Sequence, residues 1–150
     1  MKILSIPNEN GKMTCFWEEG ASSGKKPLII CLADKEEDAQ RDLNLLFSQA
    51  NGASVAALVI YPQTEEQIVG DWLYSLRQRE DVDENRITLT GTLSAADWVW
   101  RLGSHFPQWF AGICAVGGYG DPYEVRAMKN VPVRAYLVEE EPQIIRKEKV

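Results

Sequence analysis

The sequence of 150 residues contains one histidine, His105, and only three cysteines, Cys15, Cys31 and Cys114. These residues supply no spacing of the kind that binds zinc, such as C-x₂-C or H-E-x-x-H, so no metal site is predicted. The cysteines are odd in number and each lies in an apolar stretch, which favours reduced core residues over disulfides. Cys31 and Cys114 fall in segments expected to be buried strands without a nearby base, so neither is predicted to be a nucleophile.

Long apolar runs are also absent, since stretches such as 55–61 are far shorter than the ~20 residues of a membrane span. The chain does not start with a basic and then apolar signal pattern, so we expect a cytoplasmic protein without membrane association. The net charge is −6, and Lys and Arg are scattered rather than interleaved with aromatics, which excludes nucleic acid as an expected partner. The glycine-rich segment 117–120 lacks the following Lys-Ser/Thr of a phosphate-binding loop, so no cofactor is predicted.

What the sequence does contain is a regular series of predicted strands in one domain, residues 1–150, because this length fits a single core. Residues 2–7 and 13–17 predict two strands of a hairpin, joined by an Asn-Glu-Asn-Gly turn at 8–11. Continuous apolar runs are typical of parallel strands that are buried on both faces. Such runs cover residues 27–32, 55–61, 86–90, 111–116 and 133–138.

Helices are predicted between these strands, at 34–51, 64–79 and 94–106. Asp34 is expected to cap the first helix, Thr64 and Gln67 to form a capping box for the second, and Ser94 with Asp97 to do so for the third. Strands and helices that alternate in this way predict an α/β fold with right-handed crossovers. We therefore expect a three-layer αβα sandwich around a mostly parallel sheet of about seven strands, with an N-terminal β-hairpin.

Several short motifs, each weak alone, follow one another in a specific order along nearly the whole chain. They are the apolar strand at 27–32, LVIYPQ at 58–63, DENRITLTG at 83–91, WRL at 100–102, HFP at 105–107, FAGI at 110–113, GGYGDP at 117–122 and VPV at 131–133. In order and spacing they resemble the esterase, phospholipase/carboxylesterase and dienelactone-hydrolase branch of the α/β-hydrolase superfamily. The resemblance implies a shortened α/β-hydrolase-like domain with a catalytic site at a strand-to-helix turn.

At that turn, members of the superfamily carry a nucleophilic serine in a G-x-S-x-G motif. The gapless alignment of this chain places Leu93 there, between Gly91 and Ala95, and leucine is not a nucleophile. A shift of one residue offers Ser94, but its flanking residues are then Thr92 and Ala96, without the glycine that relieves the turn. We favour a helix cap as the role of Ser94.

Two further departures concern the groups that assist a nucleophile. Members carry His-Gly where this chain has Ala33-Asp34, and a carboxylate there opposes the negative charge of an oxyanion. The resemblance thus places Ala33, Asp34, Gly91, Thr92 and Ala95 around the crevice of the oxyanion region. His105 lies 11 residues beyond Ser94 on one predicted helix, about 16 Å away, and cannot act as its base.

The resemblance implies a catalytic histidine after a further strand, which we expect to be missing because the sequence stops at Val150. Glu141 aligns with the catalytic acid, although we favour a role for Glu139, Glu140 and Glu141 as charges that guard a strand end. The site is therefore predicted to be degenerate, with Leu93, Ser94 and Glu141 at vestigial catalytic positions. No proton acceptor is expected beside a hydroxyl at the bend.

These observations predict a non-catalytic hydrolase-like protein, or pseudo-esterase, that binds a small molecule or another protein in the crevice above the strand ends. Two alternatives stay open: a serine carboxylesterase that uses Ser94 with a histidine from another chain, and a structural assembly module whose crevice is filled by Leu93 and Trp98. We also expect a homodimer, formed through the edge of the last strand or through the helices around Trp98 and Trp109.

Overall fold

The computed structural model describes residues 2–8, 11–61, 63–117 and 131–136, and these form one seven-stranded sheet in the order β1-β2-β4-β3-β5-β6-β7. The strands are β1 (Lys2–Asn8), β2 (Gly11–Glu18), β3 (Lys26–Ala33), β4 (Ser54–Val59), β5 (Val82–Thr92), β6 (Gly112–Val116) and β7 (Val133–Tyr136). The helices are α1 (Glu36–Ser48), α2 (Glu66–Arg77) and α3 (Ser94–His105), with a short 3₁₀ helix, η1 (Pro107–Trp109), after α3.

The sheet has an antiparallel N-terminal part and a parallel remainder, as the sequence predicted. β1 and β2 are antiparallel neighbours, with Asn8 opposite Gly11. β2 is also antiparallel to β4, whereas β4, β3, β5, β6 and β7 are parallel neighbours. The chain therefore starts its parallel part at β3 in the middle of the sheet, and β3 and β5 come to lie side by side.

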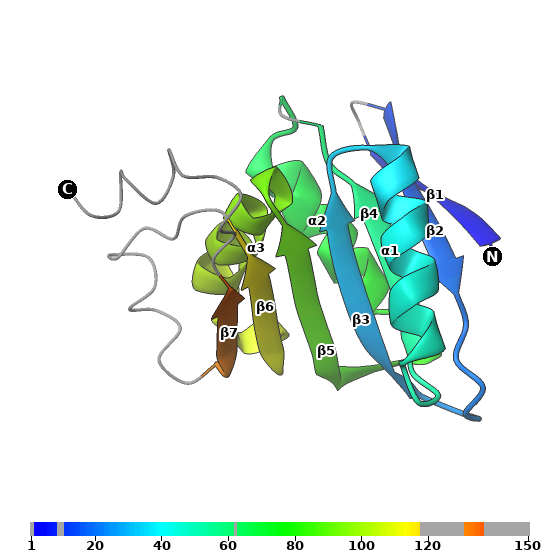
Figure 1. Cartoon of the computed structure of the whole chain (residues 1–150). Helices are drawn as coiled ribbons and strands as arrows, with labels where there is room; N and C mark the ends of the chain where they lie inside the picture. Colours follow the sequence, from blue (N-terminus) through cyan, green and yellow to red (C-terminus); the bar gives the residue numbers. More distant parts are fainter. Residues whose placement is uncertain (1, 9–10, 62, 118–130, 137–150) are drawn as a thin grey trace.

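Helices cover both faces of the sheet, with α1 on one face and α2 and α3 on the other (Figure 1). The alternation of side chains along β3 follows this arrangement, because successive residues of a strand point to opposite faces. Ile30 and Leu32 belong to the cluster on the α2 and α3 side, while Cys31 and Ala33 belong to the cluster under α1. The predicted three-layer αβα sandwich is confirmed.

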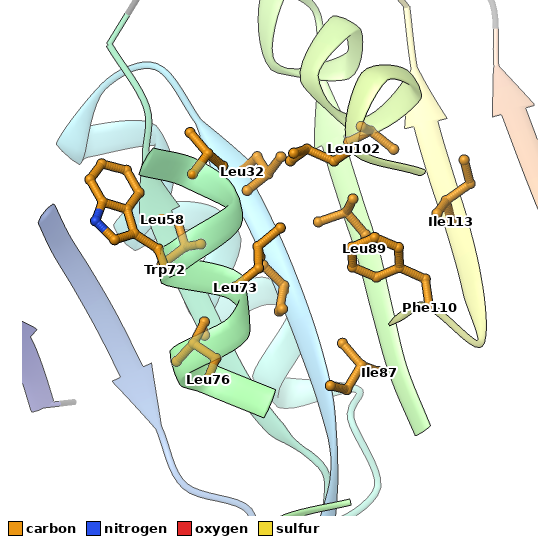
Figure 2. Close-up of a cluster of buried hydrophobic side chains, with 14 of the residues drawn as sticks. Leu32, Leu58, Trp72, Leu73, Leu76, Ile87, Leu89, Leu102, Phe110 and Ile113 are labelled. Carbon is orange, nitrogen blue, oxygen red and sulfur yellow. The ribbon is translucent and has the colours of Figure 1, made fainter. Parts of the chain in front are cut away.

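The larger of these two clusters ties α2 and α3 to the sheet. Figure 2 shows Leu73 and Leu76 of α2 and Leu102 of α3 directed toward the strands, where they meet side chains such as Leu89 of β5. All four are at most 1% exposed. Removing a buried leucine side chain of this kind costs about 2–5 kcal/mol, so this cluster fixes where α3 begins relative to the end of β5.

The predicted helix caps are wrong in detail. α1 begins at Glu36 after Lys35, and α2 begins at Glu66 after Glu65, in each case without a hydrogen bond from the capping side chain. The capping box of Thr64 with Gln67 is therefore not formed. β5 is also longer than predicted, because it extends back through residues 82–85 to pair Val82 with Lys26.

No helix within the described part of the chain is both long and apolar enough to span a membrane.

Candidate functional site

The turn from β5 into α3 is occupied by a leucine with unusual backbone angles. Leu93 follows the last residue of β5 and precedes the first residue of α3, with φ 55° and ψ −120°. A Cβ atom makes positive φ costly, and residues other than glycine persist in this conformation only where neighbouring structure holds them. Here the Leu93 N–H donates a 2.7 Å hydrogen bond to the Val116 carbonyl at the end of β6. The side chain is 47% exposed, so burial is not what holds it in place.

Gly91 allows α3 to pack closely on the end of β5. A Cβ atom at this position would lie 2.9 Å from the Ala95 carbonyl oxygen and 2.9 Å from Cγ2 of Val99. No side chain fits in that space without displacing the helix. Glycine and a small residue, Ala95, thus stand two positions on either side of Leu93, which is the spacing that the gapless alignment predicted.

Ser94 and Asp34 contact each other just beyond the ends of the neighbouring strands β5 and β3. The Ser94 hydroxyl donates a 2.8 Å hydrogen bond to Oδ2 of Asp34. Two predictions are thereby corrected: Asp34 does not cap α1, and Ser94 is the first residue of α3 rather than its cap. A third is corrected as well, because a proton acceptor, the Asp34 carboxylate, does lie beside a hydroxyl at the bend. The two side chains come within reach of each other because β3 and β5 are adjacent parallel strands, whose carboxyl ends lie at the same edge of the sheet.

The imidazole, in contrast, lies at the far end of α3. His105 is the last residue of that helix and the only histidine of the sequence. Its Nδ1 lies 2.7 Å from Oε2 of Glu66, and Oε1 of Glu66 lies 3.8 Å from Nε of Arg101. With Ser94 at the first position of the same helix, about 16 Å of helical rise separates the two residues. His105 therefore does not take a proton from Ser94 in this chain.

Two pockets open at the Ser94–Asp34 pair, one toward each face of the sheet. Both are lined by Ala33, Asp34 and Ser94. The α3-side pocket, of about 220 Å³, adds Ile60, Ala95, Asp97, Trp98 and Arg101. The α1-side pocket, of about 390 Å³, adds Lys35, Asp38, Arg41, Thr92 and Leu93. Together they form a crevice beyond the carboxyl ends of β3 and β5, the place where open parallel sheets bind their ligands.

Of the five residues predicted around this crevice, the structure brings four to the pocket walls: Ala33, Asp34, Thr92 and Ala95. Gly91 is buried beneath α3 instead. Glu141 lies outside the described residues. Sequence reasoning considered Trp98 only as a side chain that fills the crevice, and it did not place Asp97 and Arg101 there. A signal was present, because positions 94, 97, 98 and 101 share one face of a helix.

The two arginines of the crevice are held by carboxylates outside the Ser94–Asp34 pair. Arg101 stacks over Trp98 at 4.7 Å from the ring centroid and faces Glu66 on α2. In the α1-side pocket, Arg41 lies 3.4 Å from carboxylate oxygens of both Asp38 and Asp42. Asp34 is in neither of these groups.

Cys31, next to the crevice on β3, is a buried thiol. Its Sγ lies 3.8 Å from Oδ2 of Asp42. Burial, reinforced by the Asp42 carboxylate, raises the pKa of Cys31 to about 12, so it is a protonated and weakly nucleophilic thiol at neutral pH. Among the described residues no group of three or more His, Cys, Asp or Glu side chains is arranged to hold a metal ion.

Comparison with solved structures finds similar folds in esterases and related hydrolases. A thermostable esterase superposes with a TM-score of 0.79 at 16% sequence identity, covering 99% of this chain and 49% of its own. The enterochelin esterase of Shigella flexneri gives a TM-score of 0.70 at 14% identity, covering 99% of this chain and 48% of its own. A putative dienelactone hydrolase from Klebsiella pneumoniae gives 0.63 at 15% identity, covering 93% of this chain and 85% of its own.

This chain thus spans about half the length of the two esterases. No protein-family model matches the sequence, and no curated protein is significantly similar to it. At these identities the likeness concerns the fold alone.

Proposed function

Since this chain has the α/β-hydrolase fold that its motifs predicted, we propose that it is a non-catalytic protein of this fold that binds a small molecule in the crevice at Asp34 and Ser94. The observation that carries the proposal is Leu93 at the bend between β5 and α3. Hydrolases of this fold place a nucleophilic serine at such a strained strand-to-helix turn. A leucine side chain there has no group that attacks a carbonyl.

The surroundings of Ser94 support the same proposal. Ser94 lies one residue past the bend, and its hydroxyl donates a hydrogen bond to a carboxylate, not to an imidazole. The Asp34 carboxylate would also oppose the negative charge that develops on a substrate oxygen during ester hydrolysis. The alternative of an esterase that uses Ser94 with a histidine from another chain needs that histidine to displace Asp34 from the hydroxyl.

The open crevice favours a binding protein over a structural module. Leu93 is 47% exposed and lines the α1-side pocket, and Trp98 lines the α3-side pocket, so neither side chain fills the crevice. Ligand sites of known proteins are concave, with a few polar groups among apolar walls. Asp34 and Ser94 are such polar groups, with Ala33, Ile60 and Ala95 as apolar neighbours.

The test is labelling with a fluorophosphonate probe, together with turnover of 4-nitrophenyl acetate. We expect neither labelling nor turnover that depends on Ser94, so wild type, Ser94→Ala and the control Ser75→Ala, an exposed serine of α2, behave alike. Leu93→Ser, which puts a hydroxyl at the bend, is also expected not to raise turnover because no imidazole of this chain lies beside it. Labelling that disappears in Ser94→Ala but not in Ser75→Ala would contradict the proposal.

The homodimer expected from the sequence stays a prediction. Within the described residues β7 pairs with β6 and with no second strand, and Val133 on β7 is 38% exposed. An edge of this kind is suited to pair with another chain. Light scattering at micromolar concentration is expected to give twice the mass of one chain, and a monomer there would contradict the dimer.

A further inference from the structure

Asp34 lies at the centre of the crevice, and no cationic side chain in the described part of the chain pairs with it. It is the first residue after β3, it is partly buried, and it lines both the α3-side and the α1-side pocket. Its one hydrogen-bond partner among the described residues is the neutral Ser94 hydroxyl, and none of the ion pairs formed by those residues includes it. A carboxylate accepts about four hydrogen bonds through its two oxygens, so most of its capacity is left for a ligand.

Neither arginine of the crevice neutralises Asp34, because each is engaged elsewhere. Arg101 is placed between the Trp98 ring and Glu66. Arg41 is shared by Asp38 and Asp42. Lys35, the third basic residue that lines the crevice, is exposed and belongs to none of the ion pairs formed by the described residues. Among the described residues no cationic side chain pairs with Asp34, so its negative charge faces the two pockets in a partly desolvated position, where opposite charges attract more strongly than in water.

We propose that the crevice binds a small molecule that carries a primary ammonium group, with Asp34 as its charged anchor. The proposal rests on the non-catalytic binding function proposed above and names the class of ligand. An ammonium group has three donors and no acceptor. One N–H is donated to Asp34 Oδ1 and a second to Ser94 Oγ, whose own hydrogen already points at Asp34 Oδ2.

The residues that line the α3-side pocket limit the size and polarity of the rest of the ligand. Ala33, Ile60 and Ala95 offer a short apolar surface beside the anchor. The α3-side pocket, at about 220 Å³, is smaller than the roughly 300–1,000 Å³ of sites for drug-sized ligands. A short alkyl chain on the ammonium group fits this surface, whereas a carboxylate or phosphate is repelled by Asp34, and a quaternary ammonium has no N–H to donate.

The experiment is a titration followed by ¹H–¹⁵N correlation spectra at constant ionic strength. Three probes of similar size are compared, n-butylammonium, 1-butanol and butyrate, with tetramethylammonium as a cation that lacks N–H donors. We expect saturable shifts of the Ala33, Asp34 and Ser94 amides with n-butylammonium, and affinities at least about tenfold lower for the other three, since a charge-assisted hydrogen bond is lost.

Two variants test whether the carboxylate of Asp34 is the group that binds the ammonium ion. Asp34→Asn keeps the shape of the side chain and is expected to weaken n-butylammonium binding about tenfold. The matched control Asp71→Asn removes an exposed carboxylate of α2 that lines neither pocket, and is expected to change the affinity less than about twofold. Circular dichroism establishes that both variants are folded. If Asp34→Asn does not fold, the comparison of the four probes on the wild-type protein decides.

Several results would overturn the inference: no saturable shift with n-butylammonium, equal affinity for 1-butanol, or an Asp34→Asn variant that binds as well as wild type. None of these results contradicts the proposed non-catalytic function. That proposal is contradicted instead if ester turnover in the same samples depends on Ser94.

Discussion

The hydroxyl of Ser94 and the carboxylate of Asp34 lie 2.8 Å apart although 60 residues separate them in the sequence. One stands at the start of α3 and the other directly after β3. Their contact links the two central parallel strands at the edge where the crevice opens, and it explains why neither residue acts as the helix cap that its local sequence predicts.

This contact is expected to contribute measurably to stability. In a double-mutant cycle of Ser94→Ala and Asp34→Ala, we expect a coupling free energy of about 0.5–1.5 kcal/mol, because a hydrogen bond to a charged group is lost at a partly exposed position. Urea unfolding of the wild type, both single variants and the double variant measures it. The pair Ser94→Ala with Asp38→Ala, which do not contact each other, is the control and should show no coupling beyond error. A coupling near zero for the first pair would mean that the bond is not formed in solution.

Replacing the strained leucine is expected to stabilise the fold. Leu93→Gly removes a side chain that is 47% exposed from a backbone position with φ 55°. Relief of about 1–3 kcal/mol of strain outweighs the 0.5–1 kcal/mol entropic cost of a glycine, so the free energy of unfolding should rise by roughly 1 kcal/mol. The neighbouring Thr92→Gly, in regular strand conformation, should instead lower it. If both variants lose stability equally, the backbone at Leu93 is not strained.

The close packing of α3 on β5 requires glycine at position 91. Gly91→Ala puts a Cβ 2.9 Å from the Ala95 carbonyl oxygen and from Cγ2 of Val99, so we expect a loss of about 1–3 kcal/mol in the free energy of unfolding. Gly112→Ala is the matched control on β6, where the nearest atoms lie 3.5 Å away, and should change stability by less than about 1 kcal/mol. Thermal and urea unfolding of the two variants give the comparison, and an equal response would argue against close contact between helix and strand.

Alkaline pH is expected to destabilise the protein through two buried thiols. Burial raises the pKa of Cys15 and Cys31 to about 12, whereas in the unfolded chain a cysteine titrates near about 8.5. Above that lower value the unfolded chain releases these protons and the folded protein keeps them. The free energy of unfolding therefore falls as pH rises from about 8.5 toward 12, by roughly 2 kcal/mol for each thiol at about pH 10.

Urea unfolding between neutral pH and pH 10 measures this decline. The double variant Cys15→Ala/Cys31→Ala should be less stable at neutral pH, because it leaves cavities, but should lose much less stability on alkalinisation. Cys114→Ala, at a half-buried position on β6, keeps both buried thiols and should show the wild-type decline. A wild-type protein as stable at pH 10 as at pH 7 would show that burial does not raise the pKa of these two thiols.

Sequence reasoning predicted the elements well where apolar periodicity was strong. The buried runs became β3, β4, β5, β6 and β7 in one sheet, although β5 proved longer because polar residues 82–85 continue it beside β3. Helix starts were less well predicted. A capping residue competes with every other partner that the fold brings near, and at Asp34 the hydroxyl of Ser94 was the better placed partner.

The sequence by itself determined the layered α/β fold, the leucine at the bend and the presence of one histidine, because these follow from residue identity and from spacing along a single strand or helix. Only the tertiary structure decided that Asp34 meets Ser94, that Arg101 turns to Glu66, and that two pockets open where β3 and β5 end. Those contacts join segments that are distant in sequence, and which strands become neighbours depends on how the whole sheet buries its faces beneath α1, α2 and α3.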